Sequence, residues 1–126
     1  MLELKTVRLA ALRRTQDNLN ELKKTLSAYE DKVLSGEDAV QEDLLFHLAI
    51  AKASGNSSLE TLMLTITPEI ITKFEEHHVC DENQKFIAIK EHKTILEAIE
   101  KQDTAMAKES MKEHFKVLYQ YCYNLP

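Results

Sequence analysis

The sequence is poor in the residues that form turns and sheets. Only two of its 126 residues are glycine and two are proline, tryptophan is absent, and aromatic residues make up 6%. Tight hairpins depend on glycine and strands favour aromatic and β-branched residues, whereas leucine, alanine, glutamate and lysine, which dominate here, favour helices. The composition therefore predicts an all-α protein. The length, with 44% hydrophobic residues, predicts one domain with its own core over residues 1–126.

Paired cysteines, a basic charge and long apolar runs are missing as well. Cys80 and Cys122 are the two cysteines and stand far apart, which excludes a disulfide framework and a cysteine-rich zinc site. A net charge of -5 offers no basic field for nucleic acid. No apolar run approaches the ~20 residues that span a bilayer, and the start lacks the apolar part of a signal peptide. The sequence therefore predicts a cytoplasmic protein that binds no membrane and, through this chain alone, no nucleic acid.

Signatures of common enzymes are absent too. The sequence has no glycine-rich phosphate loop, no Gly-x-Ser-x-Gly turn and no His-Glu-x-x-His helix. We therefore expect a protein that is not an enzyme.

Apolar residues recur at helical spacing almost throughout, and the breaks predict six helices. They are expected at about 2–14, from 17 to the "SGED" stretch, from the "QEDLLFHLAI" stretch to "ASGNSSLE", from there to about 78, at about 81–101, and from 104 to about 123. Gly55 suits a left-handed helix end, and either Asn56 or Ser57 could cap the helix that follows, with Glu60 at capping-box spacing from Ser57. Pro68 lies inside that helix and predicts a kink.

An aspartate and a histidine stand in the apolar stretch "QEDLLFHLAI", residues 41–50. Asp43 and His47 are four residues apart, so on a helix they face the same way, one turn apart. Farther along, His92 lies about ten residues before a predicted turn at 102–103 and His114 about eleven after it. A short turn makes its two helices antiparallel neighbours, which brings these histidines to nearly equal height. The spacing indicates a metal site of three histidines and one carboxylate.

Other interpretations of these residues remain open. A single histidine in an amphipathic helix is more often hydrogen-bonded or half exposed than a metal ligand, and an Asp–His pair four residues apart can simply stabilise its helix. A rival cluster, His77, His78 and Cys80, is weaker, because adjacent histidines on a helix point about 100° apart.

Three segments, in order, resemble a known family. They are "RLAALRRT", "EDLLFHLAIAKASGNSSLETLM" and "EHKTILEAIEKQDTAMAKESMKEHF", and the resemblance covers residues 2 to about 122. The pattern is similar to the C-terminal effector-binding (FCD) domain of FadR-type regulators in the GntR superfamily. The resemblance implies an antiparallel bundle of six to seven helices that binds a small organic acid and forms a homodimer.

The resemblance also implies a set of site residues. The divalent metal of many members is held by an aspartate and three histidines, and these positions fall on Asp43, His47, His92 and His114. Zinc is the expected ion, with nickel or manganese as alternatives. For the carboxylate effector, the resemblance suggests contacts from Arg13 and Asn56, although Arg13 could equally be a surface charge at a helix end.

The resemblance implies that regulators of this kind begin with a winged-helix DNA-binding domain, and we expect that domain to be absent from this chain. The sequence fits either an excised domain or a stand-alone sensor. The expected function is ligand sensing that controls DNA binding by the missing winged-helix domain. The alternatives are a metal-free structural dimerisation module and, with less support, a metal-dependent hydrolase.

Overall fold

The computed structural model describes residues 2–77 and 82–117, and every regular element within these ranges is an α-helix. In chain order the helices are α1 (Leu2–Arg13), α2 (Gln16–Leu34), α3 (Val40–Ala53), α4 (Ser57–His77), α5 (Glu82–Glu100) and α6 (Thr104–Val117). The prediction of an all-α fold with six helices is confirmed. The limits expected near residues 78, 81 and 123 lie outside the described residues.

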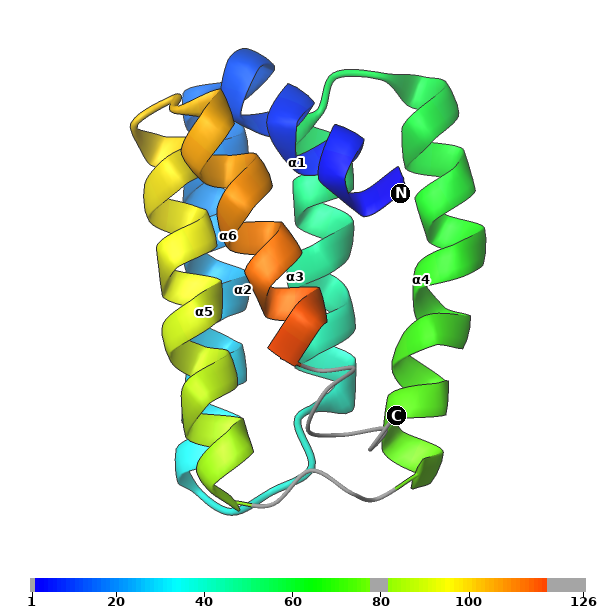
Figure 1. The fold of residues 1–126 in the computed structure, drawn as a ribbon, viewed down its shortest axis with the longest axis vertical. Coiled ribbons are helices and arrows are strands. Elements are labelled where there is room, and N and C mark those ends of the chain that lie inside the picture. Colours follow the sequence, from blue (N-terminus) through cyan, green and yellow to red (C-terminus); the bar gives the residue numbers. More distant parts are fainter. Residues whose placement is uncertain (1, 78–81, 118–126) are drawn as a thin grey trace.

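Helices α2 to α6 run roughly along the long axis of the molecule, and α1 lies across one end of them (Figure 1). Helix α3 packs against α2 and α4, α5 packs against α2 and α6, and α1 contacts α3, α5 and α6. In the described part of the chain, no helix is both long enough and apolar enough to cross a membrane. The arrangement places α3, α5 and α6 around a common interior.

Buried apolar side chains from five of the helices form one continuous core. They are Val7, Ala10 and Ala11 of α1, Leu22, Leu26, Tyr29 and Val33 of α2, Phe46, Ala49, Ile50 and Ala53 of α3, Ile89, Ile95, Ala98 and Ile99 of α5, and Ala107, Met111 and Phe115 of α6. Helix α4 adds a separate buried stripe at every fourth residue, Leu59, Met63 and Thr67. Because α4 packs mainly against α3, this stripe covers the outer side of α3.

The turn between α3 and α4 has the geometry expected from the sequence. Gly55 adopts a φ of 66°, the left-handed conformation in which a side chain would be strained. Of the two possible caps, the structure uses Asn56, whose Oδ1 accepts a hydrogen bond from the Leu59 backbone N–H at 3.0 Å. Pro68 lies inside α4 as expected, and the kink there stays a prediction.

The turn between α5 and α6 fixes the relative height of these two helices. Gln102 has a φ of 57°, its N–H donates to the Ile99 carbonyl at 3.1 Å, and the Asp103 N–H donates to the Ala98 carbonyl at 3.0 Å. The Asp103 carboxylate then caps α6 by accepting from the Met106 N–H at 3.0 Å. The short turn makes α5 and α6 neighbours, as the spacing of the histidines requires.

The end of α1 is fastened to this same turn. The Arg14 guanidinium donates to the Ile99 carbonyl at 3.3 Å and to the Glu100 carbonyl at 2.6 Å. In return, the Gln102 side-chain amide donates to the Leu12 carbonyl at 3.3 Å. The carbonyl groups at the end of α5, which lack partners within the helix, therefore receive donors from Arg14, the residue that follows α1.

Candidate metal centre

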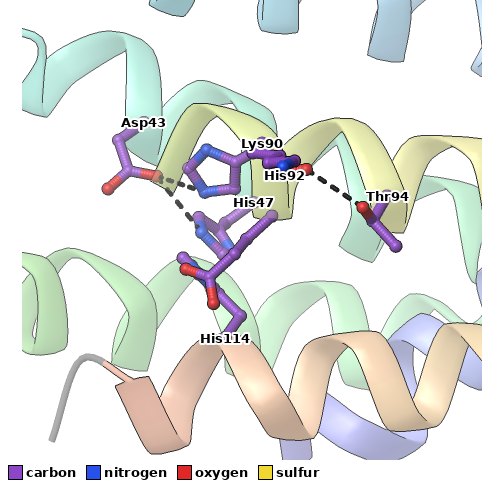
Figure 2. A network of polar contacts seen from close by, with 7 residues as sticks. Asp43, His47, Lys90, His92, Thr94 and His114 are labelled. Atoms are coloured by element: carbon purple, nitrogen blue, oxygen red, sulfur yellow. Dashed lines mark hydrogen bonds and ion pairs between the residues drawn. The ribbon is translucent and has the colours of Figure 1, made fainter. Parts of the chain in front are cut away.

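Three helices bring the predicted metal ligands together in the interior of the bundle. Asp43 and His47 come from α3, His92 from α5 and His114 from α6, and Figure 2 shows their side chains converging. The three histidines are buried, and each offers one nitrogen such that these atoms all lie within 4.8 Å of one another. Such a cluster could hold a metal ion.

Asp43 lies against two of the three imidazoles. Its Oδ1 is 3.2 Å from Nε2 of His47 and 3.3 Å from Nε2 of His92. Although these distances allow ion pairs, Asp43 Oδ1 and both ring nitrogens of His92 have no hydrogen-bond partner among the described residues. Buried polar atoms are rarely left in this state, because the loss of water is then not compensated. A cation bound among these atoms would satisfy Asp43 Oδ1 and one nitrogen of His92, so the residues present fit a divalent ion.

Aromatic rings enclose the cluster on the side of α2 and α3. The ring of His92 lies 4.6 Å from the Tyr29 ring and 5.0 Å from the Phe46 ring, measured between centroids. The imidazoles also pack on one another, with centroids 4.7 Å apart for His92 and His114 and 5.8 Å apart for the stacked rings of His47 and His114. This wall keeps the site apolar around its polar atoms, which strengthens any electrostatic interaction inside it.

The charges of the four side chains follow from burial and from their mutual contacts. Burial alone would raise the pKa of the Asp43 carboxyl, but the adjacent imidazoles outweigh it and hold that pKa well below its usual range. Burial would lower the pKa of His47, yet Asp43 reverses the effect and raises it. Burial prevails at His92, whose pKa is lowered, and at His114, whose pKa falls to about 4. Burial therefore favours the uncharged forms of His92 and His114, whereas the Asp43 carboxylate favours the protonated form of His47.

Two further carboxylates influence the cluster, and neither is predicted by the sequence. Glu91 of α5 holds His114, with 3.1 Å between Oε1 and Nδ1. Its position could have been found, since residues 91 and 114 are each about eleven residues from the turn at 102–103. Glu3 of α1 is also buried, and burial raises its pKa while the charge of the nearby His47 lowers it. Its signal is its place four residues before Val7 on the buried side of α1.

The two predicted effector contacts lie away from the histidines. Arg13 is exposed at the end of α1, and its Cδ is 3.4 Å from the point where a Cβ on Gly55 would lie. Asn56 caps α4 in the same region. Gly55 is eight residues after His47, or about 12 Å along the helix axis at ~1.5 Å per residue. The structure thus brings together the four residues predicted to bind a metal and places Arg13 and Asn56 at the α3–α4 turn.

The side chains of His77, His78 and Cys80 lie outside the described part of the chain.

Comparisons with known proteins agree with this fold. The model of the FCD domain family matches residues 1–117. A solved structure of Streptococcus agalactiae GntR superimposes with a TM-score of 0.80 at 28% sequence identity, covering 94% of this chain and 53% of that one. The structure of E. coli McbR/YncC has the same fold, with a TM-score of 0.70, 24% identity, and coverage of 94% and 59%. A search of curated protein sequences found no match.

The chain belongs to the FCD domain family, the effector-binding domains of GntR-type transcriptional regulators. It spans a little over half the length of the two solved structures. The membership confirms the family and the FCD-like fold expected from the sequence. Because these are regulatory domains and not enzymes, it also confirms the prediction that the chain is no enzyme.

Proposed function

We propose that this chain is the ligand-sensing domain of a GntR-type regulator and that it binds a divalent metal through Asp43, His47, His92 and His114. The observation that carries the proposal is a cluster of three buried imidazoles, two of which, His47 and His92, lie within 3.3 Å of a carboxylate oxygen of Asp43. By geometry, this oxygen has no hydrogen-bond partner among the described residues. A purely structural polar cluster would be expected to satisfy its own hydrogen bonds.

The ligand set favours a particular group of ions. Three neutral imidazoles and one carboxylate suit zinc best, with nickel and manganese as alternatives, and leave the bound ion with a net charge near +1 on these four groups. When bound, the ion supplies a positively charged Lewis acid to which an oxygen of a small ligand can attach. The residues of the chain fix its position and exclude water from one side of it through the rings of Tyr29 and Phe46.

The proposed effector is a small carboxylate. An ion that takes five or six ligands keeps open positions after four protein groups, and a hydroxy or keto acid could fill two of them with neighbouring oxygens. Arg13 and Asn56 stay candidates for a second contact. Thr67 is a closer candidate, because its buried Oγ1 has no hydrogen-bond partner among the described residues. Thr67 lies eleven residues after Asn56 on α4, and Asp43 lies eleven residues before Ser54 on α3. Both are therefore about equally far from the α3–α4 turn, which puts Thr67 near the height of the proposed site.

Ligand binding would act on the helices that hold the site. Metal and acid would link α3, α5 and α6, and would favour whichever packing of these helices binds them more tightly. In a homodimeric cytoplasmic regulator, that change would alter how the winged-helix domains meet DNA. The chain by itself is expected to bind no DNA, because its net charge is -5.

Metal analysis tests the central claim. Emission spectroscopy on protein purified without chelator should find about one divalent ion per chain, and the double variant His92→Ala/His114→Ala should contain none. The matched control is His77→Ala/Cys80→Ala, which should keep its metal. If the control loses the ion and the His92/His114 variant keeps it, the assignment is wrong. Absence of metal from all three would favour the metal-free dimerisation module.

A second experiment tests the effector. A thermal-shift screen of lactate, pyruvate, citrate, malonate and gluconate should show stabilisation of the zinc-loaded protein by at least one acid. A free concentration of about 100 times the dissociation constant contributes roughly 2.7 kcal/mol. Stabilisation that survives complete removal of the metal would place the acid away from the ion, and no stabilisation at all would remove the carboxylate from the proposal.

A further inference from the structure

The three histidines of the cluster differ in what holds their other ring nitrogen. His114 Nδ1 lies 3.1 Å from Glu91 Oε1, and both side chains are largely buried, with 2% and 14% of their surface exposed. By contrast, neither ring nitrogen of His92 has a hydrogen-bond partner among the described residues. In this part of the chain, His114 is the one cluster histidine that is hydrogen-bonded to a carboxylate outside the proposed ligand set.

We propose that Glu91 is a positioning residue of the metal centre, which holds the proton of neutral His114 on Nδ1 and so presents Nε2 to the ion. The inference rests on the proposed metal-binding function and deepens it by assigning the ligand atom of His114. An ionised carboxylate can only accept a hydrogen bond, so Nδ1 must be the donor in this contact. The remaining nitrogen, Nε2, then carries the lone pair.

The tautomer with the proton on Nδ1 is not the one that an isolated imidazole ring ordinarily prefers. A neutral histidine without a partner favours the tautomer with the proton on Nε2, where it would block coordination. A carboxylate that accepts a hydrogen bond from Nδ1 reverses this tautomer preference and fixes the rotation of the ring. It also makes Nε2 more basic and therefore a stronger metal ligand. Asp43 contacts Nε2 of His47 and of His92, so Nε2 would be the coordinating atom of all three rings.

Glu91 also changes the charge of the site. Counting the ion as +2 and Asp43 and Glu91 as -1 each, the groups around the ion sum to zero rather than +1. Metal binding is favoured by the additional negative charge, since Glu91 is mostly shielded from water. A neutral replacement should therefore weaken metal binding even where it keeps the hydrogen bond.

The experiment compares Glu91→Leu and Glu91→Gln with matched controls at Glu97, an exposed residue of the same helix that pairs with Lys101. Zinc affinity is measured by competition with a chromophoric chelator. The tautomer of His114 is measured in metal-free protein at pH 7.5 by two-bond ¹H–¹⁵N correlation spectra. Glu91→Leu should lose about 10–100-fold in zinc affinity, and its His114 should move its proton to Nε2. Glu97→Leu should change neither quantity.

The second variant separates positioning from simple destabilisation. Glu91→Gln keeps an oxygen that can accept from Nδ1, so His114 should retain its tautomer and the loss of affinity should be smaller than in Glu91→Leu. An unchanged His114 tautomer in Glu91→Leu, or a zinc affinity of Glu91→Gln and Glu91→Leu equal to that of the wild type, would overturn the inference. If Glu91→Leu does not fold, comparison of Glu91→Gln with Glu97→Gln decides it, since only the former should weaken zinc binding. A wild-type protein that binds no zinc would overturn the proposed function, while the spectra would still decide whether Glu91 sets the tautomer.

Discussion

The end of the bundle at the α5–α6 turn and the interior at the histidine cluster treat their polar groups in opposite ways. At the turn, carbonyl groups left over at the end of α5 receive donors from Arg14 and from the turn itself. At the cluster, Asp43 Oδ1 and both nitrogens of His92 lack a hydrogen-bond partner within the described residues. The chain satisfies the polar groups of the first region by itself, whereas the second offers polar atoms that the proposed ion could satisfy.

Of the two regions, the histidine cluster contributes less to the free energy of unfolding. A buried polar atom without a partner costs roughly 1–3 kcal/mol, whereas a formed hydrogen bond contributes about 0.5–1.5 kcal/mol. The folded state can carry such a deficit only if packing elsewhere, as in the apolar core and at the α5–α6 turn, compensates for it. Regions left unsatisfied in this way are where binding is expected.

The largest predicted effect is that of the metal on the cluster. Free zinc at about 1,000 times its dissociation constant should stabilise the fold by roughly 4.1 kcal/mol, which raises the melting temperature by more than about 10 °C. Differential scanning calorimetry with and without chelator measures the shift. The variant His92→Ala/His114→Ala is the control and should show no response to zinc. A melting temperature independent of zinc would contradict the claim that zinc satisfies the polar atoms of the histidine cluster.

Acid should weaken the metal-free protein through the same cluster. Burial lowers the pKa of folded His114 to about 4 from the ordinary 6.5, so between these values the unfolded chain binds a proton that the folded chain does not. The stability that the fold gains by keeping His114 neutral is therefore complete above pH 6.5 and is lost as the pH falls toward 4. The difference is worth on the order of 3 kcal/mol.

Chemical denaturation in chelator at pH 7.5, 6 and 5 tests this prediction. The lowered pKa of His92 acts in the same direction. The raised pKa of His47 acts oppositely, because its contribution is lost as the pH rises through that pKa. A free energy of unfolding that is constant or rises on acidification would show that His114 is not kept neutral by burial.

A break at the turn should lower stability without changing metal affinity. Arg14→Ala removes both donors to the end of α5 and should cost roughly 1–2 kcal/mol, since these hydrogen bonds are charge-assisted but partly exposed. The matched control is Arg13→Ala, one residue away and exposed, which should be nearly neutral. Urea denaturation and zinc competition measured on both variants would reveal the difference. Equal losses in the two variants would contradict the assigned role of Arg14.

The smallest predicted effect is that of Glu3→Gln, which should stabilise the metal-free protein and destabilise its complex with zinc. Glu3 is buried, and its pKa is raised mainly by burial, so at neutral pH its ionised form destabilises the metal-free fold. Glu3→Gln should therefore stabilise the metal-free protein by roughly 1 kcal/mol and weaken zinc binding, because a negative charge near the ion is lost. Paired measurements of unfolding and zinc affinity check both signs. Changes of the same direction in both would mean that Glu3 acts on packing alone.

Much of this site could be predicted because it depends on distances along single helices and around short turns. The spacing of Asp43 and His47 and the equal heights of His92 and His114 follow from the helical rise and from one turn. Glu91 obeys the same rule, but its residue type gives no signal of burial, because carboxylates are usually solvated. Glu3 is different, because α1 crosses the bundle, and the angle of that crossing depends on side-chain packing that no local spacing encodes.

The helix ends show the same limit. Both Asn56 and Ser57 are suitable caps by residue type, and the structure was needed to choose Asn56. Arg13 and Arg14 are equally basic neighbours in the sequence, yet only Arg14 reaches the α5 carbonyls. One residue turns a side chain by about 100° around the helix, so small differences in where α1 ends decide which arginine faces α5.

The α5–α6 hairpin is held at its turn by side chains from both sides. Arg14 and Gln102 hold it at the turn, while His92 and His114 lie about ten residues away, or roughly 15 Å at ~1.5 Å per residue. An ion that drew these histidines toward α3 would therefore bend α5 and α6 relative to the turn that joins them. The displacement of a helix that is held at one point grows with distance from that point, so we expect larger movement at the histidines than at the turn.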